Sequence, residues 1–154
     1  MVDAAKGYDP SSETRALVAK ILGDGAHFDS GYNKNITLKK TEAERRFELV
    51  DEIEYDFQIA INKGDHYIGI AVVNFYLKET PNDGDLWLDF QAVAISDLTI
   101  NDKKLPGKDL YQDQRLKLNK AHVAKGWNTV MLRYVNPYNT NRVGLHTYTD
   151  ASDK

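Results

Sequence analysis

Large apolar side chains occupy every second position from residue 53 to residue 61 of this sequence. They are Ile53, Tyr55, Phe57, Ile59 and Ile61, and the residues between them are Glu54, Asp56, Gln58 and Ala60. Because successive side chains of a β-strand point to opposite faces, a period of two predicts a strand with one buried face and one solvated face. A chain with such a strand must fold into a sheet that is covered on its apolar side.

More strands are predicted along the rest of the chain, with turns between them. They cover residues 66–77, 86–90, 93–100, 115–118 and 127–135. The clearest turn sequences are Asn62-Lys63-Gly64-Asp65, Pro81-Asn82-Asp83-Gly84-Asp85 and Asn101-Asp102-Lys103-Lys104. No helical pattern lies between these strands, so an all-β antiparallel sandwich or saddle is favoured over a parallel fold.

The first part of the chain differs in character, and we expect an N-terminal arm over residues 1–36 and a β domain over residues 37–154. Asp9-Pro10-Ser11-Ser12-Glu13 can start a short helix and Gly23 can end it. Turn residues such as Asp29-Ser30-Gly31 follow. The pattern predicts a separate helix on a mobile tether, which can dock on a partner or on its own domain.

A second short helix is predicted at the start of the β domain. Thr41-Glu42-Ala43-Glu44 has the spacing of a capping box, in which a Thr side chain and an acid three residues later satisfy free N–H groups. We expect this helix to run to about Val50 and to place Ala43, Phe47 and Val50 on one apolar face.

Several segments in order resemble one known family. Glu42-Ala43-Glu44-Arg45-Arg46-Phe47-Glu48-Leu49-Val50, followed by Tyr55-Asp56-Phe57, resembles the opening of the N-terminal domain of the aminopeptidase N-like zinc metallopeptidases. Gly144-Leu145-His146-Thr147-Tyr148-Thr149-Asp150 is similar to a segment near the end of that domain. Residues 86–90 and 98–101 fall where the family has two of its strands. The resemblance covers about residues 35–150 and implies a saddle-shaped antiparallel β domain.

The resemblance does not extend to the chemistry of that family. Its zinc site requires a His-Glu-x-x-His helix, in which two His side chains lie at i and i+4 on one face. The four His residues here, His27, His66, His122 and His146, never have this spacing, and no Gly-x-Met-Glu-Asn segment occurs. We therefore expect no enzymatic activity, no metal and no cofactor. Because the sequence ends four residues after Asp150, we interpret the chain as a β module retained without a catalytic domain.

Composition narrows the choice of partners. The net charge of −3 and the pI near 5.8 argue against binding to nucleic acid or to an anionic membrane. No apolar stretch approaches the ~20 residues that span a bilayer, and we expect no membrane insertion. Cys is absent and the N-terminus has no apolar signal region, so a cytoplasmic location is expected, with the cytoskeleton as one setting.

Two other kinds of site are disfavoured. Acidic residues cluster around one turn, namely Glu79, Asp83, Asp85 and Asp89. Pro81 and Phe90, however, fall where an EF-hand loop needs calcium ligands, so a solvated acidic turn is favoured. His146 and Asp150 form the nearest His–carboxylate pair in a motif, but no nucleophile accompanies them.

The function favoured at this stage is a non-catalytic protein-binding or scaffold subunit of a larger assembly, with other protein subunits as partners and no small-molecule substrate. The residues expected to contact a partner are Leu17, Ile21 and Leu22 of the arm and Tyr138 and Arg142 of the loop after the last strand. One alternative is an accessory domain or fragment that docks on a separate zinc aminopeptidase chain. A weaker alternative is a carbohydrate- or ligand-binding sandwich, which would need a cleft lined by exposed aromatic residues.

Overall fold

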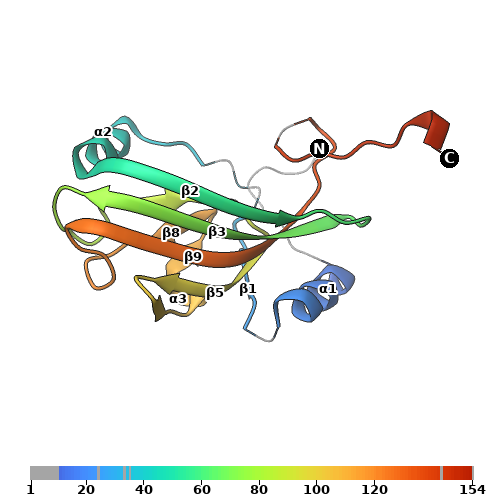
Figure 1. Ribbon diagram of the computed structural model, residues 1–154, viewed down its shortest axis with the longest axis horizontal. Helices are drawn as coiled ribbons and strands as arrows, with labels where there is room; N and C mark the ends of the chain where they lie inside the picture. The colour runs from blue at the N-terminus through green and yellow to red at the C-terminus, as the bar shows by residue number, and fades with distance from the viewer. Residues whose placement is uncertain (1–10, 24, 33, 35, 143, 154) are drawn as a thin grey trace.

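Two antiparallel sheets form most of the protein in the computed structural model, which describes residues 11–23, 25–32, 34, 36–142 and 144–153 (Figure 1). In spatial order the larger sheet contains β1 (His27–Phe28), β5 (Ala94–Ile100), β9 (Gly126–Pro137), β3 (His66–Leu77) and β2 (Val50–Ala60), and β6 (Lys103–Lys104) pairs with β5. The smaller sheet contains β4 (Trp87–Asp89), β8 (Arg115–Lys117) and β7 (Tyr111–Gln112). The described helices are α1 (Ser12–Leu22), α2 (Lys40–Leu49), α3 (Gly107–Leu110) and a 3-10 turn at Ala151–Asp153. A mostly antiparallel β fold is thus confirmed.

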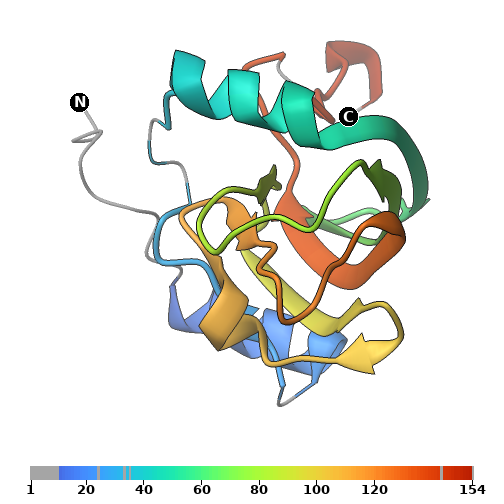
Figure 2. The ribbon, with the colours of Figure 1, turned by 90° about the vertical axis from the view of Figure 1, so that its left-hand side faces the viewer.

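The smaller sheet lies on one side of the larger sheet, as Figure 2 shows in a view along the strands. Val73 of β3 pairs with Val130 of β9, and Val130 pairs with Ile100 of β5, so these three side chains form one row across the sheet. All three are almost completely buried, and Leu116 of β8 and Tyr111 of β7 belong to the same core. This core holds the two layers together.

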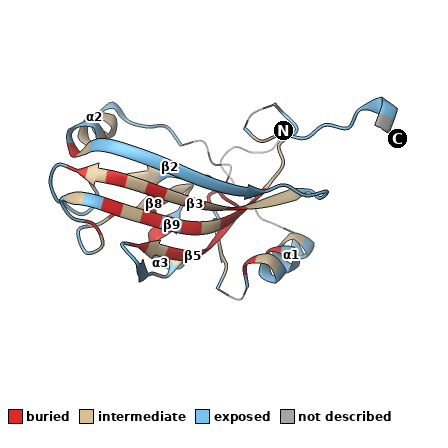
Figure 3. Ribbon diagram, viewed as in Figure 1, coloured by how far each residue is buried: buried red, intermediate tan, exposed pale blue. Residues whose placement is uncertain are grey.

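β2 ends the larger sheet and departs from the predicted burial. The strand itself is confirmed, and it pairs with β3 from one end to the other. All of its residues after Val50 are exposed on both faces, which Figure 3 shows as an unbroken pale-blue ribbon. The prediction of a half-buried strand is therefore wrong. Alternation reveals that one face is apolar, but burial requires a covering layer, and the short strands of the smaller sheet leave β2 uncovered.

The N-terminal helix docks on its own domain. Ser11 caps α1 by accepting a hydrogen bond from Thr14 N, and the helix ends at Gly23, as the sequence predicts. Val18 and Leu22 are buried against β5 and β9, in a cluster that includes Val135. Among the described residues the arm is thus docked on its own domain, which is one of the two docking places expected for it, and it also adds β1 to the sheet. The helix-start residues Asp9 and Pro10 lie outside the described residues.

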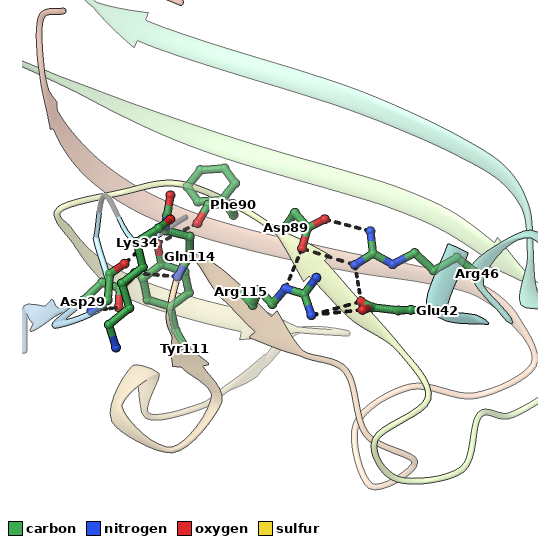
Figure 4. Close-up of polar contacts among 10 residues, drawn as sticks. Asp29, Lys34, Glu42, Arg46, Asp89, Phe90, Tyr111, Gln114 and Arg115 are labelled. Atoms are coloured by element: carbon green, nitrogen blue, oxygen red, sulfur yellow. Dashed lines mark hydrogen bonds and ion pairs between the residues drawn. The ribbon is translucent and has the colours of Figure 1, made fainter. Parts of the chain in front are cut away.

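A buried carboxylate anchors the segment after β1. Asp29 begins the predicted turn and accepts a 2.8 Å hydrogen bond from Gly31 N. It also accepts hydrogen bonds of 2.8 Å from Asp113 N and 2.6 Å from Gln114 N, at the tip of the β7–β8 hairpin. The side chain of Gln114 returns a 2.6 Å hydrogen bond to Lys34 O (Figure 4). Burial raises the pKa of the neighbouring Tyr111 hydroxyl, which donates to Phe90 O and keeps its proton.

α2 differs from its predicted form in two respects. It begins at Lys40 with Lys39 as N-cap and without a side-chain cap, so Thr41 lies inside the helix and the capping box does not form. Phe47, expected on the apolar face, is 82% exposed, and Leu49 is the residue that α2 buries. The helix has only 10 residues and runs directly into β2, so one inward-facing turn at its end is all that reaches the core.

Candidate functional site

The uncovered face of β2 is the main surface feature of the protein. We call Ile53, Tyr55, Phe57 and Ile59 the apolar row. They lie opposite Phe75, Val73, Ala71 and Gly69 of β3, in that order. The β3 residues are buried, whereas the side chains of the apolar row are between 45% and 56% exposed. The core-facing side of the sheet therefore continues onto β2 without a covering layer.

The apolar row is ordered along the strand. The rings of Tyr55 and Phe57 stack with their centroids 6.0 Å apart and their planes 11° from parallel. Val50 and Ile61 extend the apolar character beyond the two ends of the row, and Ile61 is exposed. Contiguous exposed apolar surface of this kind is a common feature of binding sites in proteins.

A groove of about 360 Å³ opens between the two sheets at one end of the apolar row. Its walls include Ile53 and Tyr55 of β2, Val73 and Phe75 of β3, and Leu86, Trp87 and Leu88 at β4. β4 is the end strand of the smaller sheet, so the groove lies between the edges of both sheets. The charged residues in its lining are Arg46 and Asp89, and both are engaged in ion pairs.

The two charged lining residues of the groove belong to a set of four charged side chains that contact one another (Figure 4). Arg46 of α2 donates a 2.8 Å hydrogen bond to Asp89 of β4 and a 2.7 Å hydrogen bond to Glu42. The guanidinium of Arg115 on β8 lies 3.1 Å from a carboxylate oxygen of Glu42 and 3.1 Å from one of Asp89. We call this set the charged ring. It ties α2 to the end strand β4 and to the central strand β8 of the smaller sheet.

The charged ring is electrostatically balanced, with two cations and two anions in alternation. Burial disfavours the charged form of Arg46, but its bonds with Asp89 and Glu42 outweigh this effect and raise the pKa of Arg46. The side chains of Arg46, Arg115 and Glu42 are all less than a quarter exposed, so solvent screens the ring only in part. Such a cluster can act as a structural clamp between α2 and the smaller sheet.

The opposite face of β2 is acidic. Glu52, Glu54 and Asp56 are exposed and alternate with the apolar row. Their β3 neighbours are Tyr76, Asn74 and Val72, none of which carries a charge. Among the residues that the structure describes, none of the three acids takes part in an ion pair. β2 thus presents one apolar and one negatively charged face.

The predicted contact residues lie in different places. The Tyr138 hydroxyl accepts a hydrogen bond from Asn62 N and donates one to Asn62 O, so this side chain holds the chain after β9 against the β2–β3 hairpin. Arg142 is exposed on the following turn. In α1, Leu17 is exposed and Ile21 is half-buried, whereas Leu22 is buried in its own domain and has little surface for a partner. The structure does not bring these residues together with the apolar row.

The acidic turn is explained by arginine pairing. Arg45 binds Asp85 at 2.9 Å and Glu79 at 3.2 Å, and Arg46 binds Asp89. No group of three or more potential metal ligands occurs in the part of the chain that the structure describes. For the charged ring, the sequence gives one signal, the spacing of four residues between Glu42 and Arg46. Asp89 and Arg115 lie on distant strands and join them only in the folded protein.

Comparisons with known proteins leave the family open. No protein-family model matches the chain. No curated protein matches it either. Among the described residues, no helix is both long enough and apolar enough to cross a membrane. Any proposal about function therefore depends on the surface of this structure, above all on β2.

Proposed function

We propose that this protein is a non-catalytic protein-binding or scaffold subunit of a larger assembly, in the cytoplasm or on the cytoskeleton. The observation that carries the proposal is the apolar row, which continues the core face of the sheet into solvent. Burying a half-exposed aromatic or aliphatic side chain contributes roughly 1 kcal/mol, so four in one row can supply much of the energy of a stable contact.

The resemblance to the aminopeptidase N-like family supports the same proposal. A saddle domain of that family packs one of its surfaces on a catalytic neighbour, and an apolar face without its neighbour needs another partner. Both carboxylates of the charged ring are paired with arginines, and the other residues that line the groove are hydrophobic, which favours binding over catalysis. The second candidate is an accessory domain that docks the same face on a separate zinc aminopeptidase chain.

Quantitative affinity capture from cytoplasmic extract tests the proposal. Tyr55→Ser removes a ring from the apolar row, and Tyr148→Ser is the matched control because Tyr148 is 78% exposed and lies outside the row. We expect Tyr55→Ser to deplete a defined set of proteins by at least about tenfold and the control to retain them. The same protein set bound by wild type and Tyr55→Ser would contradict the proposal.

The captured material also separates the two candidates. If the partner is a zinc aminopeptidase, peptidase activity on aminoacyl reporters co-purifies with wild type and is lost with Tyr55→Ser. If the chain is a scaffold subunit, the captured proteins carry no such activity. Imaging of the tagged chain tests the proposed location, and exclusion from the cytoplasm would contradict it.

A further inference from the structure

We infer that β2 binds an extended segment of a partner protein as an added strand, and that this segment alternates apolar with basic residues. The inference rests on the proposed function and names the chemistry of the partner at the same surface. It combines three properties of β2, which are its free edge, its apolar face and its acidic face.

The free edge comes first. β2 is 11 residues long and ends the larger sheet among the described strands. Every second residue of an end strand directs its N–H and C=O groups away from the sheet, where another strand can pair with them. Proteins usually block such edges with Lys, Pro or a bulge. β2 contains neither Lys nor Pro, and its register shift lies at its first residues, between Val50 and Glu52, so its pairing is regular from Glu52 to Ala60.

The two faces of β2 then specify the side chains of the added strand. Residues of a paired strand lie directly beside their neighbours on the same face, with Cβ atoms about 5 Å apart. Apolar side chains of the partner would lie beside the apolar row and cover Tyr55 and Phe57. The alternate side chains would lie beside Glu52, Glu54 and Asp56, where positive charges pair favourably and negative charges are repelled.

A second copy of the same chain fits this edge poorly. When the apolar rows of two copies overlap fully in an antiparallel pair, Ile53 faces Ile59 and Tyr55 faces Phe57. In that register Asp56 faces its own counterpart on the acidic side. Each copy also carries a net charge of −3, which adds to the repulsion. A basic segment gains from the charges that oppose self-association.

The first experiment measures binding of synthetic peptides to the whole protein by fluorescence anisotropy. The probe is a peptide of the same length as β2 that alternates Val or Ile with Lys or Arg. Two comparison peptides replace the basic residues with Asp and Glu, or keep the composition and scramble the alternation. We expect the basic alternating peptide to bind at least about tenfold more tightly than either, and its binding to weaken with salt. Equal binding of the three peptides would overturn the inference.

The second experiment tests backbone pairing. Only alternate N–H groups of an added strand bond to β2, so two N-methylated versions of the probe, methylated at odd or at even positions, must differ. We expect one version to lose binding by about tenfold or more and the other to retain it. Amide hydrogen exchange of alternate β2 residues should slow in parallel. If both methylated peptides lost binding equally, or both retained it equally, the probe would bind through side-chain contacts without strand addition.

The third experiment uses variants of the protein. The double variant Glu54→Gln, Asp56→Asn should bind the basic probe about three- to tenfold more weakly than wild type. The control variant Glu44→Gln, Asp102→Asn should bind it as tightly as wild type, since both of its changed residues are exposed outside β2. Sedimentation of Phe57→Ser beside Phe47→Ser tests the alternative occupant. If wild type is a dimer that dissociates in the Phe57→Ser variant but not in the Phe47→Ser variant, the β2 edge binds a second copy of the chain and the inference is overturned.

Failure of the inference and failure of the proposed function remain distinguishable. If Tyr55→Ser loses captured proteins but the probe shows no preference, the apolar row binds a partner of another shape. If the probe shows its preference but Tyr55→Ser captures the same proteins as wild type, the edge binds peptides in isolation and the scaffold proposal fails.

Discussion

Asp29 and Gln114 lie 85 positions apart, yet the Asp29 carboxylate accepts a 2.6 Å hydrogen bond from the backbone N–H of Gln114. Asp113 and Gln114 adopt left-handed backbone conformations, with φ of 54° and 62°, as in a tight two-residue hairpin turn. The N–H groups of this turn point at the carboxylate, so one buried side chain links the N-terminal segment to the smaller sheet. The helix α1 and strand β1 are thereby held as parts of the domain.

Replacing this carboxylate should destabilise the whole fold. Asp29→Ala leaves two buried or half-buried N–H groups of the β7–β8 hairpin without an acceptor, and we expect a loss of about 3 kcal/mol in the free energy of unfolding. Asp29→Asn retains one acceptor oxygen and should lose less. Urea unfolding followed by tryptophan fluorescence measures both. Equal stability of Asp29→Ala and wild type would show that the segment is not held by this contact.

The strands were largely predictable because their signal is local. The predicted segments 66–77 and 127–135 match β3 and β9, and the turn at Asn101 and Asp102 forms with φ of 51° and 64°. β1 was missed because its two residues are too few for a periodic pattern. Its pairing with β5 depends on the distant docking of α1 and Asp29, which no local pattern encodes.

Exposure of β2 could not be predicted from the same pattern. Phe57 and Phe75 both occupy apolar positions of regular strands, and the sequence around them gives no reason to treat them differently. The difference is the layer above them, since the smaller sheet covers β3 and stops before β2. The charged ring has the same origin, because Asp89 and Arg115 meet Arg46 only after both sheets have formed.

Two phenylalanines on one face should therefore respond differently to truncation. Phe75 is 3% exposed and Phe57 is 48% exposed. We expect Phe75→Ala to cost about 3–5 kcal/mol, since it opens a cavity in the core, and Phe57→Ala to cost about 1 kcal/mol or less. Urea denaturation of both variants checks the contrast. A cost for Phe57→Ala similar to that of Phe75→Ala would mean that β2 is covered in solution.

The charged ring should contribute more to stability than an ordinary surface pair. Glu42→Gln leaves Arg46 and Arg115 close to each other with only Asp89 to balance them, and we expect a loss of about 1–3 kcal/mol. The matched control is Glu44→Gln, because Glu44 pairs with Lys40 on the exposed side of the same helix. An exposed pair of this kind contributes about 0.5 kcal/mol or less. Thermal and urea unfolding of both variants, at low and high salt, distinguish the two. Equal losses would contradict a structural role for the ring.

His66, at the start of β3, should make stability depend on pH. Burial lowers the pKa of His66 below its ordinary value of about 6.5, because the charged imidazolium loses hydration, and the nearby Asp65 carboxylate opposes this only in part. Between the lowered pKa and about 6.5, the unfolded chain binds a proton that the folded chain does not. The free energy of unfolding should therefore decrease as the pH falls below about 6.5, and His66 should contribute no pH dependence well above this value. Urea midpoints measured across this window should fall less steeply for His66→Asn than for wild type, whatever the absolute stability of the variant. The exposed His146 provides the control, and a slope that changes with His146→Asn but not with His66→Asn would contradict the assignment.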